Sequence, residues 1–421
     1  MTNPPPPVAR LSTCLCLLLA LVWPASPLGA QTAGVPTGPL VASACVSDDG
    51  LGRDAAELCG HVNVRLGQID GMRLADVDKV LGSSDGLDPR AAIGGLVEMI
   101  EDGQRAFKSG DIPGALRSVR RALEGLVPLE PWLKERIVLQ RALALVLDAR
   151  ATQGDPPGEL EEAAKRLLTI GAAPLKKATD LITTAAAEEA LERAAQALQT
   201  DPPGQVEVQS TVPQSEVFID GVFVGVTPLR LGDIPAGDHI VRVRRTGYKP
   251  AVQLIRTQAS ERAYVDLVLE PMSNLGAYDS AMVQLQLEAG LPRGGQGMDD
   301  LRALLFIDQL VVLRVRREGT QVQVEASLYD LGSLQQLAST VRPLSDGSTA
   351  ARRSLAAVLL DDLLQTINLD VSGSGGPALW NEWWFWTGVG AVALTAITVV
   401  VILNVESEPP PTTGGIELQF E

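Results

Sequence analysis

Residues 217–228 read V-F-I-D-G-V-F-V-G-V-T-P, and this stretch decides the fold of the middle of the chain. Short runs of β-branched and aromatic residues flank Asp220 and Gly221. A two-residue hairpin turn needs positive φ at both central positions, and an Asp-Gly pair meets that need. The stretch therefore predicts an antiparallel hairpin inside a β module.

The residues around this hairpin resemble the PEGA domain, a small all-β module of bacterial envelope proteins. The resemblance implies a β sandwich over residues 205–271, and we interpret its glycines as positions where backbone geometry excludes a Cβ. Alternation in residues 239–245 predicts that Ile240 points outward relative to Val241 and Val243, and that the arginines face solvent. The turn residues that carry the resemblance are Asp220, Gly221, Gly225, Pro228, Pro235, Gly237 and Gly247.

The composition narrows the class of protein. A chain of 421 residues is long enough for two or three domains. Its formal net charge is -16, and no Lys/Arg cluster is larger than that of Arg242, Arg244 and Arg245. Because phosphate binding needs basic patches, we expect no nucleic-acid partner.

Both ends of the chain carry membrane-related signals. Residues 1–30 predict a signal peptide, since the apolar run 11–22 is too short to span a bilayer, and residues 31–39 predict a linker. Residues 383–403 are uncharged and follow a cluster of tryptophans, which favours a transmembrane helix with an aromatic belt; a buried core helix is the alternative. We therefore expect a single-pass protein of the bacterial inner membrane, with most of the chain in the periplasm and residues 404–421 as a short cytoplasmic tail.

Small residues form a stripe on the predicted transmembrane helix. Their spacing of three and four places them on one face, which lets two helices approach closely in lipid. The stripe predicts self-association, although such spacing also arises by chance. Its members are Gly388, Ala391, Thr395 and Thr398.

Two cysteines remain after removal of the predicted signal peptide, Cys45 and Cys59. In an oxidising compartment they can form a disulfide. Closing a loop of about 15 residues contributes about 3 kcal/mol in the chain-entropy model. Two buried free thiols are the alternative.

Residues 91–200 are rich in Ala and Leu and predict helices. Residues 99–128 resemble one tetratricopeptide unit, with Gly103, Ala115 and Ala122 at its small positions. Helices are also expected over residues 132–151, 159–168 and 175–199. Repeats of this kind stack and commonly offer a concave face to a peptide, whereas a plain helical bundle offers no groove.

The remaining segments predict an α/β region. Residues 40–82 predict a strand–helix–strand unit, and residues 277–345 predict two helices, a hairpin and a third strand. The hairpin weakly resembles the α/β domain of periplasmic assembly factors related to CsgG and FlgO, which implies that residues 40–80 complete its sheet. Residues 349–369 predict an amphipathic helix that precedes a linker at residues 372–379. Its buried stripe is predicted to be Leu355, Val358, Leu359, Leu363 and Ile367, with Arg352, Arg353 and Asp361 opposite.

Few residues suggest chemistry. The chain has two histidines, His61 and His239, too few for a histidine-based metal cluster or a catalytic triad. The loop L-P-R-G-G-Q-G at residues 291–297 lacks the spacing of a phosphate loop. We therefore predict no catalytic, metal or cofactor residues and no enzyme.

These expectations combine into an α+β multidomain fold: a tetratricopeptide-like helical region, a small all-β sandwich, an α/β region with an antiparallel hairpin, and one C-terminal transmembrane helix. The predicted function is a non-enzymatic, membrane-anchored cell-envelope protein whose modules bind envelope proteins or cell-wall glycan. The alternative is an assembly factor that forms homo-oligomers at the membrane through its α/β domain.

Overall fold

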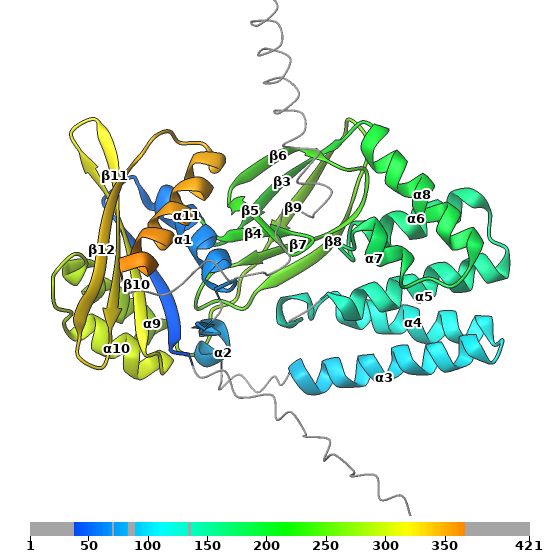
Figure 1. The fold of residues 1–421 in the computed structure, drawn as a ribbon, viewed down its shortest axis with the longest axis horizontal. Helices are drawn as coiled ribbons and strands as arrows, with labels where there is room; N and C mark the ends of the chain where they lie inside the picture. Colours follow the sequence, from blue (N-terminus) through cyan, green and yellow to red (C-terminus); the bar gives the residue numbers. More distant parts are fainter. Residues whose placement is uncertain (1–37, 70, 83–88, 134–135, 367–421) are drawn as a thin grey trace, which may run out of the picture. The chain divides into compact units, whose positions relative to one another are not determined.

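The computed structural model describes residues 38–366, apart from residues 70, 83–88 and 134–135. All of these residues belong to one compact unit. They form a five-stranded sheet with helices on both faces, a helical region and a β sandwich (Figure 1). Three predicted segments lie outside the described residues: the signal peptide, the linker at residues 372–379 and the cytoplasmic tail.

The first sheet joins two distant parts of the chain. Strand β1 pairs in parallel with β10, and Val41 lies opposite Gln309. Strands β10, β11 and β12 form an antiparallel meander. Residues near the start of the chain therefore complete a sheet whose other half follows the β sandwich. The strand order is β12 (Gln335–Leu344), β11 (Gln321–Asp330), β10 (Gln309–Glu318), β1 (Leu40–Ser47) and β2 (Arg73–Leu74).

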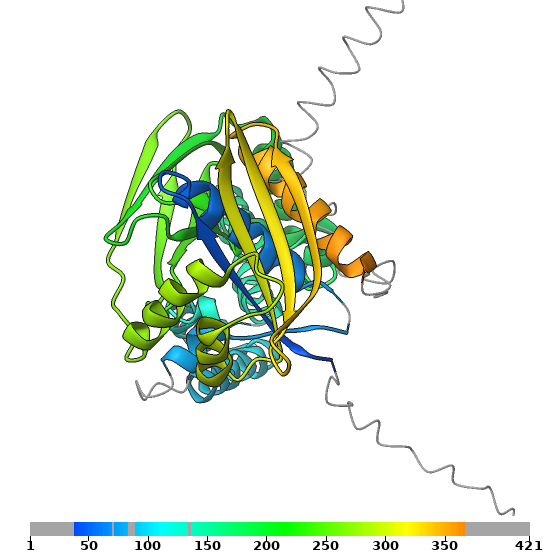
Figure 2. The ribbon, with the colours of Figure 1, turned by 90° about the vertical axis from the view of Figure 1, so that its left-hand side faces the viewer.

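Helices cover both faces of this sheet (Figure 2). On one face, α1 (Gly52–Leu66) and α11 (Thr349–Thr366) bury Leu58 and Leu359 against Leu313 of β10. On the other face, the covering helices are α2 (Val77–Leu81), α9 (Leu275–Glu288) and α10 (Gln296–Leu305). Consecutive residues of β10 are buried because they point in turn to the two cores, Val311 and Leu313 to one and Leu310 and Val312 to the other.

The amphipathic pattern of α11 differs from the prediction. Leu359 and Leu363 are buried, but Val358 is 43% exposed and Arg352 is only 7% exposed. Arg352 turns inward because Asp54 and Glu57 of α1 supply carboxylates for its guanidinium group. The described part of the helix runs to Thr366, and Ile367 lies outside the described residues.

The helical region begins with a hairpin of the kind expected. A Cβ on Gly103 would lie 3.3 Å from Leu145 Cδ2, while Ala115 and Ala122 are fully buried. These small residues let α3 and α4 pack closely. The elements are α3 (Pro89–Lys108), α4 (Ile112–Leu126), the 3₁₀ turn η1 (Glu130–Trp132), α5 (Ile137–Gln153), α6 (Pro157–Leu168), α7 (Leu175–Thr179) and α8 (Ala185–Thr200).

The long helix predicted over residues 175–199 is wrong, because α7 and α8 are separate. Asp148 of α5 accepts hydrogen bonds from the backbone N–H groups of Thr183 and Thr184, at 2.9 and 3.0 Å, and from both hydroxyls. These bonds hold the connecting segment out of a helix, and Thr184 then caps α8.

The β module is a sandwich of two sheets with an apolar core that includes Val206, Val217 and Val241. Asp220 and Gly221 have φ of 49° and 79°, which is the turn that the sequence predicts. Strand β6 was not predicted, because its sequence L-R-L-G-D-I contains weak strand formers. The sheets are β6 (Leu229–Ile234), β3 (Gly204–Ser210) and β9 (Arg262–Leu267), and β5 (Val222–Val226), β4 (Glu216–Ile219), β7 (Gly237–Arg244) and β8 (Ala251–Thr257).

The fold class needs one correction, because the part of the chain that the structure describes contains no helix long and apolar enough to cross a membrane. Its two longest helices, α3 and α11, are interrupted by charged residues such as Asp102 and Asp361. The structure therefore supports a mixed fold of helices and sheets, without the transmembrane helix of the prediction. The predicted span 383–403, with Gly388, Ala391, Thr395 and Thr398, lies outside the described residues.

Candidate functional site

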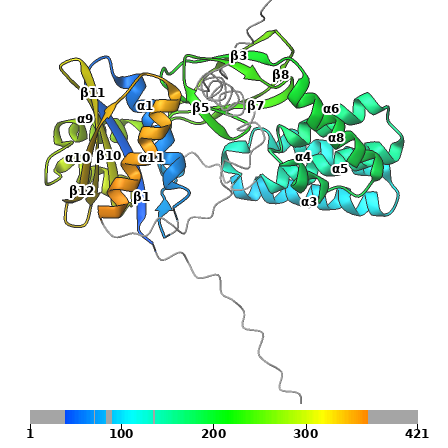
Figure 3. The ribbon, with the colours of Figure 1, turned by 45° about the horizontal axis from the view of Figure 1, so that its top comes forward.

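The helical region contains an apolar groove of about 780 Å³, which we name the α4–α6 groove. Helix α5 packs between α4 and α6 (Figure 3). Its side chains form the floor of the groove. The floor residues Leu139, Leu143 and Val146 follow a spacing of four and three, which places them on one face of α5. A volume of this size lies within the range of about 300–1,000 Å³ that is typical of binding sites.

Two helices and one strand complete the groove. Leu123 of α4 and Val127, which directly follows α4, form one wall, and Ala163 of α6 forms part of the other. Strand β8 of the sandwich contributes Leu254 and Arg256. Leu254 is 45% exposed although it is a large apolar residue. The groove is therefore built by the helical region and the sandwich together.

Charged side chains surround the apolar floor. Arg150 pairs with Asp155 at 2.7 Å and also with Glu159, and Arg256 pairs with Glu162. Arg120 and Glu124 of α4 also line the groove, but neither makes a hydrogen bond or ion pair within the described part of the chain. The α4 side of the rim therefore offers one positive and one negative group to a partner.

The alternation predicted for β7 is confirmed, because Val241 and Val243 lie in the sandwich core and Ile240 lies on the opposite face of the strand. The arginines, however, do not face solvent as predicted. Ile240 is fully buried in the core of the helical region. Arg242 lies 3.1 Å from Glu130 Oε2 and stacks over the Phe218 ring at 4.0 Å, while Arg244 lies 2.6 Å from Asp78. The face of β7 that carries Arg242 and Arg244 is covered because other parts of the chain supply carboxylates for these two arginines. Burial lowers the pKa of Arg242, and the Asp78 carboxylate raises the pKa of Arg244.

Asp220 does more than shape its turn. Its Oδ2 lies 2.6 Å from His239 Nδ1, and its Oδ1 accepts a hydrogen bond from the Ile240 N–H at 2.9 Å. His239 Nε2 lies 2.8 Å from the Pro235 carbonyl oxygen. Burial opposes a charged imidazole, but the Asp220 carboxylate and these hydrogen bonds outweigh it and raise the pKa of His239. Both ring nitrogens face acceptors, which is the arrangement of a structural imidazolium.

The other predicted turn residues occupy turns or strand ends and carry no chemistry. Gly225, Gly237 and Gly247 have φ of 145°, 147° and 84°, conformations that strongly favour glycine. Pro228 follows a cis peptide bond from Thr227.

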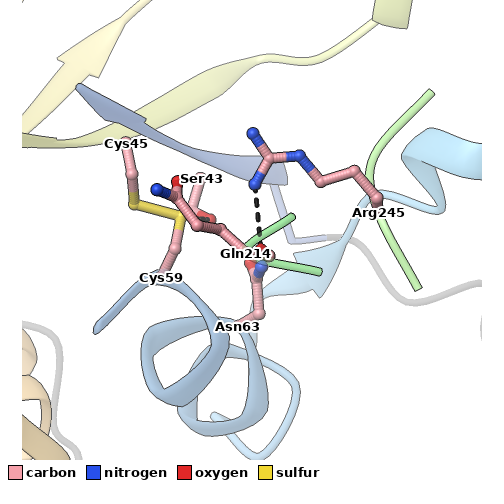
Figure 4. Close-up of a disulfide and its surroundings, with 6 residues drawn as sticks. All are labelled: Ser43, Cys45, Cys59, Asn63, Gln214 and Arg245. Carbon is pink, nitrogen blue, oxygen red and sulfur yellow. Dashed lines mark hydrogen bonds between the residues drawn. A yellow bond between two sulfur atoms is a disulfide. The ribbon is translucent and has the colours of Figure 1, made fainter. Parts of the chain in front are cut away.

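Cys45 of β1 and Cys59 of α1 form a disulfide, with their Cα atoms 6.0 Å apart (Figure 4). Two residues after Cys59 on α1, His61 stacks edge-on against Phe223 of the sandwich, with ring centroids 4.8 Å apart. Burial, followed by the charges of Arg353 and Arg352, lowers the pKa of His61 to about 3. Within the described residues, no cluster of three His, Cys, Asp or Glu side chains could hold a metal ion.

The sequence did not reveal how the groove is completed. Leu254 belongs to a strand that was predicted, and the strand pattern alone gave no sign that this side chain would line a cavity in the helical region. Glu130 and Asp78 were also missed, since their partners Arg242 and Arg244 lie far along the chain. The only local signal that Glu130 and Asp78 would be buried was that each of these acidic residues lies next to apolar residues.

The comparison with protein families identifies one part of the chain. Residues 203–273 match the model of the PEGA domain, close to the boundaries expected from the turn residues. No curated protein and no solved structure matches the chain. The matched module is of the envelope type that mediates protein interactions. The β sandwich of this chain is therefore a PEGA domain.

Proposed function

We propose that this chain is a non-enzymatic cell-envelope protein that binds a segment of a partner protein in the α4–α6 groove. The groove itself carries the proposal, because it combines an apolar floor with charged residues at its rim. Apolar centres with polar edges are typical of protein interfaces. The PEGA domain supports an envelope setting and also supplies part of the groove wall.

An amphipathic helix is the partner that fits the groove best. Helices α4 and α6 lie on either side of α5, so a further helix can pack its apolar ridge between them. Helix-in-groove recognition uses apolar anchors at spacings of three and four, which match the spacing of the floor residues. Arg120 and Glu124 are one helical turn apart, so a partner helix with an acid and a base one turn apart would complement them.

The disulfide supports the location that we propose. Disulfides persist in oxidising compartments such as the periplasm and are rare in the cytosol. The Cys45–Cys59 bond lies within the α/β domain and joins a central strand to the helix that covers it. We therefore place the described domains on the exported side of a bacterial envelope.

Leu254→Asp tests the groove without altering a core. Leu254 is 45% exposed, so the change puts a charge at the groove wall and leaves the sandwich core intact. The matched control is Val268→Asp, which alters another exposed apolar residue of the PEGA domain, 68% exposed and outside the groove. Tagged full-length chains would be used to capture proteins from the envelope fraction, with quantification by mass spectrometry.

A second variant fills the groove. A Cβ on Gly158, which lines the groove, meets no atom within 4 Å, so Gly158→Phe can place a ring in the cavity; Gly94→Phe on α3 is its control. We expect Leu254→Asp and Gly158→Phe to lose the same captured protein at least tenfold while both controls retain it. If all four variants capture every protein equally, partner binding in the groove is wrong.

The second candidate function is assembly through the α/β domain. Val283 and Leu287 lie one turn apart on α9 and are 62% and 74% exposed, and Phe306 at the end of α10 is 76% exposed. Exposed apolar residues in this number favour an interface. Leu287→Asp would be compared with the unchanged chain by size-exclusion chromatography and light scattering. A homo-oligomer that dissociates in the variant supports assembly, and a monomer in both contradicts it.

A further inference from the structure

A second cavity, of about 310 Å³, lies between the α/β domain and the PEGA domain. Strand β1 and helix α1 form one side, and loops of the PEGA domain form the other. We name it the polar cleft and define it by Ser43, Asn63, Gln214, Arg245, Thr246 and Tyr278. It continues into a cavity of about 270 Å³ that shares Ser43, Asn63, Thr246 and Tyr278.

Arg245 differs from the two arginines that precede it. Arg242 and Arg244 each pair with a carboxylate, at 3.1 and 2.6 Å. Arg245 is half-buried, and within the described residues its guanidinium makes one hydrogen bond, from Nη1 to the Gln214 carbonyl oxygen at 3.1 Å. Figure 4 shows this group turned toward the segment that holds Gln214. A guanidinium has five N–H donors, so most of its donors remain available to a ligand.

The other free groups of the cleft can also donate. Ser43 Oγ donates to Asn63 Oδ1 at 2.6 Å, which orients the amide and leaves its nitrogen without a partner in the described structure. The hydroxyls of Tyr278 and Thr246 likewise have no hydrogen-bond partner among the described residues. Burial raises the pKa of Tyr278 to about 12, so its hydroxyl keeps its proton at neutral pH. Arg245, Asn63, Thr246 and Tyr278 therefore all supply donors to the lining of the cleft.

Two carboxylates also line the cleft. Glu216 lies 3.7 Å from Arg244 and is engaged by it, and Asp279 is exposed. Neither is within ion-pair distance of Arg245 in the described structure. The wall opposite Arg245 is fixed by the Cys45–Cys59 disulfide, so the cleft can keep its shape without a ligand.

We propose that the polar cleft binds a small carboxylate that also carries hydroxyl groups, of the size and chemistry of a uronic acid. Arg245 binds the carboxylate, because a guanidinium presents paired donors that match carboxylate geometry. Asn63, Thr246 and Tyr278 donate to the remaining oxygens of the ligand. The volume of about 310 Å³ suits one sugar ring.

Isothermal titration of the purified full-length chain with D-glucuronate and D-glucose tests this site. The two sugars differ in the carboxylate, so we expect glucuronate to bind at least tenfold more tightly, the usual size of a charge-assisted hydrogen bond. Arg245→Met should remove that difference. Tyr278→Phe, which keeps the ring, should weaken glucuronate binding by about two- to tenfold.

The matched control is Arg53→Met. Arg53 also donates to a single backbone carbonyl, that of Pro228 at 3.0 Å, but it lies outside the cleft. Leu254→Asp alters the α4–α6 groove but not the polar cleft, so it should leave glucuronate binding unchanged. The proposal is overturned if neither sugar binds, if both bind equally, or if Arg245→Met and Tyr278→Phe both bind glucuronate as the unchanged chain does.

Discussion

Arg352 of α11 donates a hydrogen bond from Nη1 to Oε2 of Glu57 in α1, 3.0 Å away and 295 positions earlier in the chain. The same guanidinium binds Asp54, with Nε 2.9 Å from Oδ1. Arg352 is 7% exposed and Glu57 is 1% exposed, so this ion pair is buried between the two helices on one face of the sheet. It fixes the position of the last described helix against the first.

Removal of Arg352 should destabilise the α/β domain strongly. Breaking a buried ion pair leaves an uncompensated charge, at a cost of about 3–5 kcal/mol. We therefore expect Arg352→Met to lower the free energy of unfolding by this amount in urea denaturation. Arg353→Met is the control. Arg353 is next to Arg352 but exposed, so its replacement should change the free energy of unfolding by less than about 0.5 kcal/mol. Equal effects of the two changes would contradict the assignment.

His239 should stabilise the PEGA domain most at acidic pH. Its pKa is raised by Asp220 above the ordinary value of 6.5, although burial opposes the charge. The stabilisation is therefore complete below about pH 6.5 and is lost as pH rises through the raised pKa. Asp220→Asn keeps a residue that tolerates the turn and should lower the pKa of His239 in an NMR titration of its ring protons. A pKa that stays unchanged in this variant would exclude Asp220 as the cause.

His61 should act in the opposite sense. Its pKa is lowered to about 3, so the folded state keeps it neutral while the unfolded state binds a proton below about pH 6.5. Stability is then lost as pH falls, by at most roughly 1.4 kcal/mol per pH unit. His61→Leu should flatten this part of the curve of unfolding free energy against pH. Since the chain has only two histidines, NMR can follow both rings separately.

Loss of the disulfide should weaken the α/β domain. Cys45 and Cys59 are 14 positions apart, and the chain-entropy model gives about 3 kcal/mol for a loop of this length. Cys45→Ser with Cys59→Ser should lower the unfolding free energy by this amount. Alkylation followed by mass measurement checks the bond directly. Two alkylated thiols at these positions in the unreduced, unfolded chain would show that no bond forms.

Replacing each of two helical glycines with alanine should change the free energy of unfolding in opposite directions. A Cβ on Gly60 of α1 would lie 2.3 Å from Phe223 Cζ, so Gly60→Ala should destabilise the fold by about 1–3 kcal/mol. Gly94 of α3 has open space at this position, so Gly94→Ala should stabilise it by about 0.5–1 kcal/mol. Adding Phe223→Leu should recover part of the loss in Gly60→Ala. Denaturation curves of the three variants and the unchanged chain provide the measurement.

The sequence predicted correctly those features that depend on residues close together in the chain. The Asp220–Gly221 turn could be predicted because two positive φ angles in succession restrict the residues that fit. The alternating apolar residues of β10 and β11 likewise predicted the hairpin. The two cysteines that follow the predicted signal peptide suggested a bridge, and the structure joins them.

The features that the sequence did not predict depend on contacts between residues far apart in the chain. The charge of Arg352 predicted a solvent-facing position, and only the acids of α1 explain its burial. The break between α7 and α8 depends on Asp148, which lies 35 positions before Thr183. The groove and the polar cleft each combine residues from separate modules, so no single stretch could have predicted either of them.

The position of β1 has a consequence for how the chain reaches this structure. The Leu40 N–H donates to Asp308 Oδ2, 268 positions later, and β1 lies between β2 and β10 in the sheet. Strand β1 is made early but has no partner longer than two residues until β10 has been synthesised. Contacts this far apart in the chain slow folding and leave an apolar strand open to aggregation. The helical region and the PEGA domain are completed first, so they can fold early and hold the two halves of the sheet near one another.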